Sequence, residues 1–135
     1  MSEQENIAVV KRMFEAFAQG DLEAVLSYCS NDVAVQHPMP TAIWPWAGSF
    51  RGRAKLKEFL LGVTAAETFE VFEAREFIAQ GNKVVVNVFE RPRMKTTGKA
   101  FNNDYIQVYT LSEGLITSIK IFEDTGLVIS AMHPD

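Results

Sequence analysis

Apolar residues in the first half of the chain recur at three- and four-residue spacing, which predicts helices with one buried face. A first helix is expected to end at Gly20, and Asp21 is a suitable N-cap for a second. Residues 30–32 are expected to stop that second helix, and a third is predicted to begin at Arg53. The buried faces of the three helices are predicted to carry Ile7, Val10, Phe14, Phe17 and Ala18; Leu22, Val25, Leu26 and Cys29; and Leu56, Phe59, Leu60 and Val63.

After Ala66 the spacing changes to the alternation that is typical of strands. One earlier strand is expected over residues 33–37, ending at Pro38 and followed by a long loop rich in proline and tryptophan. The later strands are predicted over residues 68–72, 74–79, 83–91, 100–111 and 115–122, with a short helix over about 125–132. Consecutive strands joined by short turns predict an antiparallel meander, and helices followed by strands predict an α+β fold. We expect one domain over residues 1–135.

Alternation also divides the side chains of the last two strands between two faces. Ile106 and Val108 share a face with Asp104, and Ile119 and Ile121 lie on the apolar face of the last strand. We expect the helices to cover this apolar face, which would bury Asp104 as a paired or protonated carboxyl. The other face is expected to be exposed, either solvated or in contact with a second copy of the chain. Its residues are Tyr105, Gln107, Tyr109 and Phe122.

Composition excludes several classes of function. The net charge is −4 and the basic residues are scattered, whereas nucleic-acid binding needs a concentrated basic surface. The single cysteine, Cys29, cannot form an internal disulfide and is expected to be a small buried side chain. No residue spacing indicates a metal site, a phosphate-binding loop or a serine triad. Because the sequence shows no signal peptide and no apolar run of membrane length, we expect no membrane association and a cytoplasmic location.

Two long segments resemble the nuclear-transport-factor-two-like superfamily. Its start is similar to VKRMFEAFAQGDLEAVLSYCSNDVAVQHP followed by FRG, and its end is similar to NDYIQVYTLSEGLITSIKIFEDT. The superfamily includes ketosteroid isomerases, SnoaL-like polyketide cyclases, limonene epoxide hydrolases and scytalone dehydratases, and the WPW loop and IFEDT ending look most like SnoaL-like members without an assigned substrate. The resemblance implies an open cone, in which N-terminal helices cover the concave face of a curved antiparallel sheet and enclose a pocket.

The resemblance to ketosteroid isomerases bears on chemistry residue by residue. Those enzymes use an aspartate base with an oxyanion hole made by a tyrosine and a protonated aspartic acid. The tyrosine position falls on Met13, which cannot donate a hydrogen bond, the base position falls on His37, and the protonated acid falls on Asp104. Steroid isomerisation by that machinery is therefore not expected. The remaining candidates are His37 and Asp104, a carboxyl–imidazole pair predicted to face one pocket.

Each of these candidates has a second interpretation. His37 suits a general base because imidazole titrates near neutrality, yet it could equally bond a backbone group before Pro38. Asp104 could be a structural carboxylate satisfied by a neighbouring amide such as Asn87 or Asn102. In SnoaL-like cyclases an aspartate near the end of the last strand acts as the acid–base group. A gap-free alignment places it on Asp124, whereas strand alternation turns Glu123 inward, and both stay candidates.

The predicted pocket lining is mostly apolar. It consists of Trp44, Trp46, Tyr28, Met13, Phe17, Ile106, Ile119 and Ile121. Glu90, Arg91 and Arg93 are expected to be surface charges beside Pro92.

Two functions fit these observations. The first is an isomerase, cyclase or hydrolase that uses acid–base chemistry on a small apolar, carbonyl-bearing molecule and needs no cofactor. The second is a homodimeric module of the same fold that binds a small ligand or partner without turnover.

Overall fold

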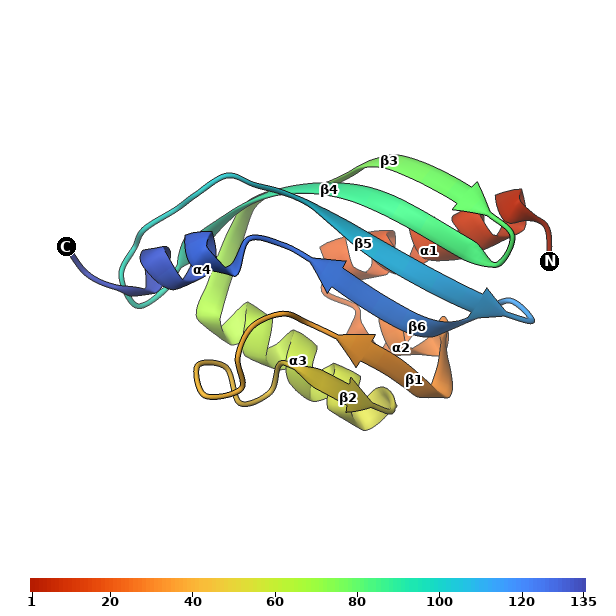
Figure 1. Ribbon diagram of the computed structural model, residues 1–135, viewed down its shortest axis with the longest axis horizontal. Coiled ribbons are helices and arrows are strands. Elements are labelled where there is room, and N and C mark those ends of the chain that lie inside the picture. The colour runs from red at the N-terminus through yellow and green to blue at the C-terminus, as the bar shows by residue number, and fades with distance from the viewer.

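Six strands form one curved sheet that does not close on itself, and helices lie along one of its faces (Figure 1). The computed structural model describes residues 1–135. The elements in chain order are α1 (Glu3–Ala18), α2 (Leu22–Ser27), β1 (Cys29–Gln36), β2 (Ser49–Arg51), α3 (Arg53–Ala66), β3 (Glu67–Gln80), β4 (Lys83–Met94), β5 (Asn103–Ser112), β6 (Leu115–Phe122) and α4 (Thr125–Met132). The α+β class and the curved sheet with N-terminal helices are confirmed.

The sheet is mixed rather than fully antiparallel. Its strand order is β2-β1-β6-β5-β4-β3, and the last four strands in the chain form the predicted antiparallel meander. The prediction of a fully antiparallel sheet is wrong for β1, which pairs in parallel with β6 through Val35 and Ile119. The connection between these strands contains most of the chain, so no short turn forces them to run in opposite directions.

Several element boundaries differ from the prediction. The second helix ends at Ser27 and Cys29 already begins β1, and a short strand, β2, follows the tryptophan-rich loop. One long strand, β3, replaces the two predicted between residues 68 and 79. Its register shifts between Phe69 and Val71 and again between Ala74 and Glu76. These irregularities interrupt the simple alternation of side chains, which is why the sequence looked like two strands.

The orientation of β5 is opposite to the prediction. Gln107 pairs with Ile121 and Tyr109 pairs with Ile119, so these four side chains share the concave face beneath the helices. Tyr105, Gln107 and Tyr109 are buried, whereas Asp104 is exposed and Ile106 lies on the convex side. Of the four residues assigned to an exposed contact face, only Phe122 is exposed, at 58%. The surface proposed for a homodimer is therefore wrong, and dimerisation itself stays a prediction that light scattering would test.

The core lies between α1 and the centre of the sheet. Val84, Val86 and Val88 project from β4 with no exposed surface. Phe14 of α1 belongs to the same core cluster, and Phe72, Phe77 and Tyr109 surround its ring. Cys29 is fully buried as predicted, and burial raises the pKa of its thiol to about 11. None of the helices has both the length and the apolar character needed to cross a membrane.

Candidate functional site

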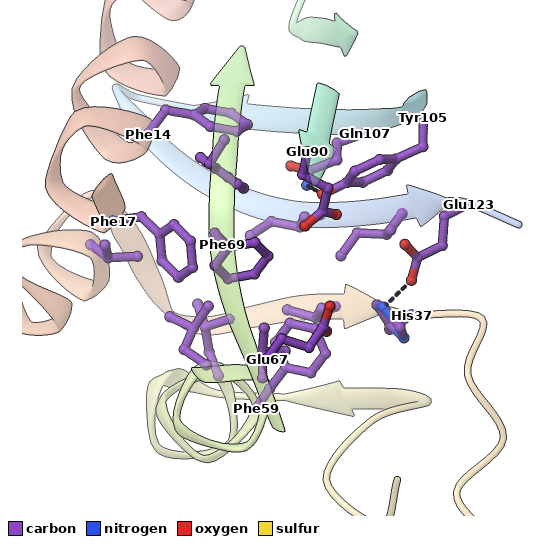
Figure 2. Close-up of a pocket in the computed structure, with 18 of the residues that line it drawn as sticks. Phe14, Phe17, His37, Phe59, Glu67, Phe69, Glu90, Tyr105, Gln107 and Glu123 are labelled. Carbon is purple, nitrogen blue, oxygen red and sulfur yellow. Dashed lines mark hydrogen bonds and ion pairs between the residues drawn. The ribbon is translucent and has the colours of Figure 1, made fainter. Parts of the chain in front are cut away.

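A cavity of about 100 Å³ lies between the concave face of the sheet and the helices. Its apolar wall combines six aromatic side chains with nine aliphatic ones. Its polar groups come from β3, β4, β5 and the ends of β1 and β6 (Figure 2). An apolar pocket with a few convergent polar groups is the usual form of a small-molecule site. The aromatic lining residues are Phe14, Phe17, Trp44, Phe59, Phe69 and Phe72, and the polar ones are His37, Glu67, Glu90, Asn103, Tyr105, Gln107, Tyr109 and Glu123.

The structure brings about half of the predicted site residues to this cavity. Those that line it are His37, Glu123, Trp44, Met13, Phe17, Ile119 and Ile121. Those that do not are Asp104, Asp124, Trp46, Tyr28 and Ile106.

Asp104 does not belong to the site. Its side chain is on the convex, exposed side of β5 and accepts a hydrogen bond of 2.6 Å from Asn87 Nδ2. A carboxyl–imidazole pair between Asp104 and His37 is therefore excluded. The inward position one residue earlier is taken by Asn103, which is 2% exposed. A shift of one residue along a strand moves a side chain to the opposite face, and this accounts for the error.

The structure separates Glu123 from Asp124. Glu123 points into the pocket, as the alternation from Ile119 and Ile121 indicated. Asp124 is exposed and is the N-cap of α4, where its Oδ1 accepts a hydrogen bond of 2.9 Å from the Gly126 N–H. Asp124 has a structural role that leaves it outside the cavity.

Three residues that were predicted to line the pocket lie outside it: Trp46, Tyr28 and Ile106. Trp46 lies behind Trp44, with ring centroids 4.6 Å apart, and its ring packs directly on Gly62, where a Cβ atom would be only 2.2 Å away. Tyr28 is the C-cap of α2 and packs against the core at its edge. Ile106 is on the outer face of β5 for the same reason as Asp104.

The central polar contact joins His37 to Glu123. His37 Nε2 lies 2.7 Å from Glu123 Oε1, and the two side chains are 5% and 6% exposed (Figure 2). The Met39 N–H donates to His37 Nδ1 at 3.2 Å, so Nδ1 carries no hydrogen. His37 is therefore neutral and donates its Nε2 hydrogen to a Glu123 carboxylate. Because Pro38 has no N–H, Met39 is the first backbone donor after the histidine.

Asn103 connects this pair to a second carboxyl group. Its Nδ2 donates to Glu123 Oε2 at 2.9 Å and to Glu90 Oε1 at 3.3 Å. Glu123 thus receives one hydrogen bond on each oxygen, from His37 and from Asn103, which is the environment of an ionised carboxylate. Each of its oxygens keeps a lone pair for a ligand.

Two further carboxyl groups in the cavity, Glu90 and Glu67, have strongly raised pKa values. Burial and the charge of Glu123 raise the pKa of Glu90 to about 8, although hydrogen bonds from Tyr105 and Asn103 act in the other direction. Burial, Glu90 and Glu123 raise the pKa of Glu67 to about 8 as well. At neutral pH both groups are therefore mainly protonated. A carboxyl group that is kept protonated beside a second carboxyl group can serve as the acid of an acid–base pair.

Two tyrosines extend the polar network along β5. The Tyr109 hydroxyl donates to Gln107 Oε1, and Gln107 Nε2 donates to the Tyr105 hydroxyl at 3.1 Å. Burial raises the pKa of both tyrosines well above the usual value, so they stay protonated. Both tyrosines line the pocket from the sheet, and α1 contributes Met13 to the same lining.

The sequence reasoning missed Glu90, Glu67, Asn103 and the β5 tyrosines. A signal for Glu90 was present, because Val84, Val86 and Val88 alternate toward it along one strand face. Glu90 was instead grouped with Arg91 and Arg93 as a surface charge, which is wrong because it is 6% exposed. Glu67 follows a helix directly, where no periodicity indicates its orientation.

Comparisons with known proteins agree with the fold. The SnoaL-like domain family matches residues 10–119. A crystal structure of an NTF2-like protein from Burkholderia xenovorans is 33% identical over 98% of this chain and 99% of that chain, with a TM-score of 0.87. TerC, co-crystallised with polyporic acid, is 27% identical over 95% of this chain and 98% of its own, with a TM-score of 0.86.

A third structure, of a proposed polyketide cyclase from Xanthomonas campestris, is 20% identical over 97% of this chain and 98% of that one. Its TM-score of 0.78 shows a shared fold alone. No curated protein matches the chain.

Proposed function

The chain belongs to the SnoaL-like domain family, and we propose that it is an acid–base enzyme that moves a proton on a small, largely apolar, carbonyl-bearing molecule. The observation that carries this proposal is the placement of Glu123 and Glu90 around one amide, Asn103 Nδ2, inside an aromatic cavity. Such a pair supplies a base and an acid on one wall of the pocket. Proton transfer needs only positioned acids and bases, so no cofactor is required.

The proposed step is enolisation. Glu123 takes a proton from the carbon next to the substrate carbonyl. The electron pair of the broken C–H bond forms a C=C bond, and the π pair of the C=O bond moves onto the carbonyl oxygen. Glu90 gives its proton to the carbonyl oxygen as negative charge develops there, which produces a neutral enol. Return of a proton to a different carbon completes an isomerisation, and attack of the enol carbon on a second carbonyl would close a ring.

This proposal changes the role that the sequence suggested for His37. Both ring nitrogens are already engaged, one with Met39 N and the other with Glu123, so no lone pair is free to take a proton from a substrate. His37 acts as a positioning residue that holds the Glu123 carboxylate. Trp44, with its ring centroid 6.0 Å away, and Phe59, at 5.0 Å, fix the plane of the imidazole.

The names of similar proteins are compatible with such a substrate. TerC was crystallised with polyporic acid, and another neighbour is described as a proposed polyketide cyclase. The aromatic wall of the present cavity suits a flat ring, because aromatic rings pack well in stacked or edge-on arrangements.

The alternative is ligand binding without turnover. It is favoured by the hydrogen bonds that engage both ring nitrogens of His37 and the Nδ2 of Asn103, because neither group is then free to take a proton from a ligand. The two functions predict different results when the protein is incubated in D₂O with a panel of small ketones and enones. Turnover predicts deuterium incorporation next to the carbonyl above the buffer rate, whereas binding alone predicts none with any compound that binds.

A further inference from the structure

Glu67 is a buried carboxyl group that has no partner within the chain. It is 7% exposed and lines the cavity, and no side chain hydrogen-bonds it or forms an ion pair with it. Glu90 and Glu123, in contrast, are both held by Asn103. The fully buried side-chain atom that lacks a partner is Asn6 Oδ1, so the Glu67 oxygens are open to the cavity, where a ligand group can reach them.

Glu67 also lies at a different place in the cavity from the acid–base pair. It is the first residue of β3 and pairs with Met94, whereas Glu90 pairs with Phe72. Glu90 and Met94 are four residues apart on β4, which corresponds to roughly 13 Å of backbone along an extended strand. The side chains of Glu67 and Glu90 converge from these two points into one cavity, where their charges interact. Figure 2 shows Glu67 and Glu90 reaching into the cavity from separate points, with Phe59 beside Glu67. A ligand held by Glu90 would therefore present another of its atoms to Glu67.

We propose that Glu67 is a specificity-determining residue that hydrogen-bonds a second oxygen of the substrate, so that the pocket selects a cyclic hydroxyketone or diketone over a simple ketone. This inference rests on the proposed function and names its substrate class. The size of the cavity sets the scale of the ring. Its volume of about 100 Å³ is smaller than the roughly 150 Å³ cavity that holds benzene, so the cavity limits the substrate to at most one six-membered ring.

The chemistry of Glu67 suits a neutral oxygen function. A carboxylic acid donates one hydrogen bond and still accepts others, so it can bind either a carbonyl or a hydroxyl group. An anionic group is disfavoured, because Glu90 and Glu123 lie close enough to raise the pKa of Glu67. A site built to bind an oxygen also rejects the analogue that lacks it, since its own polar group is then left unpaired.

Dissociation constants for three matched probes test this inference. Cyclohexanone, 3-hydroxycyclohexanone and 4-hydroxycyclohexanone share a ring and a carbonyl and differ only in the second oxygen. We expect the wild-type protein to bind at least one hydroxyketone about tenfold more tightly than cyclohexanone. In Glu67→Leu this preference should disappear while cyclohexanone affinity changes by less than about twofold. Glu67→Gln, which keeps a donor, should retain most of the preference.

The binding experiment tests the role of Glu67 independently of whether the protein is an enzyme. Binding is measured without turnover, and Glu123→Gln should keep the preference for the hydroxyketone even though exchange is lost. Absence of deuterium exchange with an intact preference would reject the enzyme and leave Glu67 as a binding residue. Equal affinity of the wild-type protein for all three probes, or a preference that survives in a folded Glu67→Leu variant, would overturn the inference. Thermal unfolding of each variant shows that it is folded.

Discussion

His37 Nε2 lies 2.7 Å from Glu123 Oε1, in a contact from which solvent is almost excluded. The two residues follow different strands, β1 and β6, which run parallel and side by side. Because the ends of parallel strands lie at the same edge of a sheet, the residues that follow them meet there. The pairing therefore comes from the topology of the sheet, and each of the predictions below tests what this pair and its carboxyl neighbours do.

Replacement of His37 should lower the rate of proton transfer more than it weakens binding. Without the Nε2 hydrogen the Glu123 carboxylate can rotate, and a misplaced catalytic group costs about 100-fold in rate. For His37→Ala we expect a fall of that order in kcat for deuterium exchange, with KM changed by less than about threefold. His37→Gln, whose amide can still donate, should recover part of the rate. An equal effect on KM would indicate that His37 binds substrate directly.

Glu90→Gln should remove the acid and change the pH profile. Burial and the charge of Glu123 raise the pKa of Glu90 to about 8, so the group is protonated below that pH. Wild-type kcat should therefore fall as pH rises through about 8. In Glu90→Gln we expect a rate lower by roughly 10²-fold or more, without this alkaline limb. If kcat of the variant still falls through pH 8 as in the wild type, a group other than Glu90 is responsible for that fall.

Stability should decrease as pH rises from about 4.5 to about 8. Glu67 and Glu90 have an ordinary pKa of 4.5, and in the folded chain burial and neighbouring carboxylates raise it to about 8. The folded chain thus binds more protons across this interval, so these groups favour folding at low pH and lose that contribution as pH rises.

Unfolding by urea at pH 5 and pH 8 measures this effect. A pKa that is raised from 4.5 to about 8 corresponds to at most about 5 kcal/mol for each group, so several kcal/mol are expected from the pair. The Glu67→Gln/Glu90→Gln double variant should therefore lose less stability between the two pH values than the wild-type protein. A loss as large as that of the wild-type protein would show that these carboxyls are not the source.

Gly62→Ala should disturb the aromatic wall although it lies on a helix. The added Cβ would be 2.2 Å from Trp46 Cδ2, and Trp46 supports Trp44 beside His37. Overpacking costs about 1–3 kcal/mol, which exceeds the gain of up to about 1 kcal/mol in helix propensity. We expect a lower melting temperature and weaker ligand binding. Leu61→Ala, at an exposed neighbouring position, is the control and should leave stability within about 0.5 kcal/mol.

Much of the fold was predictable because it depends on local patterns. The start of α3 at Arg53 and the span of α4 follow from helical spacing and from Asp124 as a cap. The inward direction of Glu123 followed from alternation with Ile119 and Ile121. These features depend on neighbours in the sequence, so the sequence alone carries them.

The orientation of β5 was not predictable by the same rule. Apolar side chains were assumed to face inward, yet the inner face of β5 lines a cavity and carries Tyr105, Gln107 and Tyr109. The outer face carries Ile106 and Val108, which alternation alone cannot distinguish from a core. Where the interior is a polar-lined pocket, hydrophobicity no longer identifies the buried side.

The acid–base set was the least predictable part of the site. Glu67, Glu90 and Glu123 come from three different strands or strand ends, and their protonation depends on one another and on burial. Alternation indicates the inward direction of Glu90 and Glu123, but no pattern in the sequence indicates which carboxyl group stays protonated. Only the curvature of the sheet brings them around one cavity.

The central claim is that Glu123 is the base, and its neighbour in the sequence provides a matched control. Glu123→Gln and Asp124→Asn each remove one carboxylate at the end of β6, but only the first faces the pocket. The measurement is deuterium incorporation next to the carbonyl of cyclohex-2-enone in D₂O, followed by NMR. We predict that Glu123→Gln lowers the enzymatic rate by about 10²-fold or more, whereas Asp124→Asn keeps it within about twofold of wild type. Exchange that is equally fast in wild type and Glu123→Gln would contradict the account.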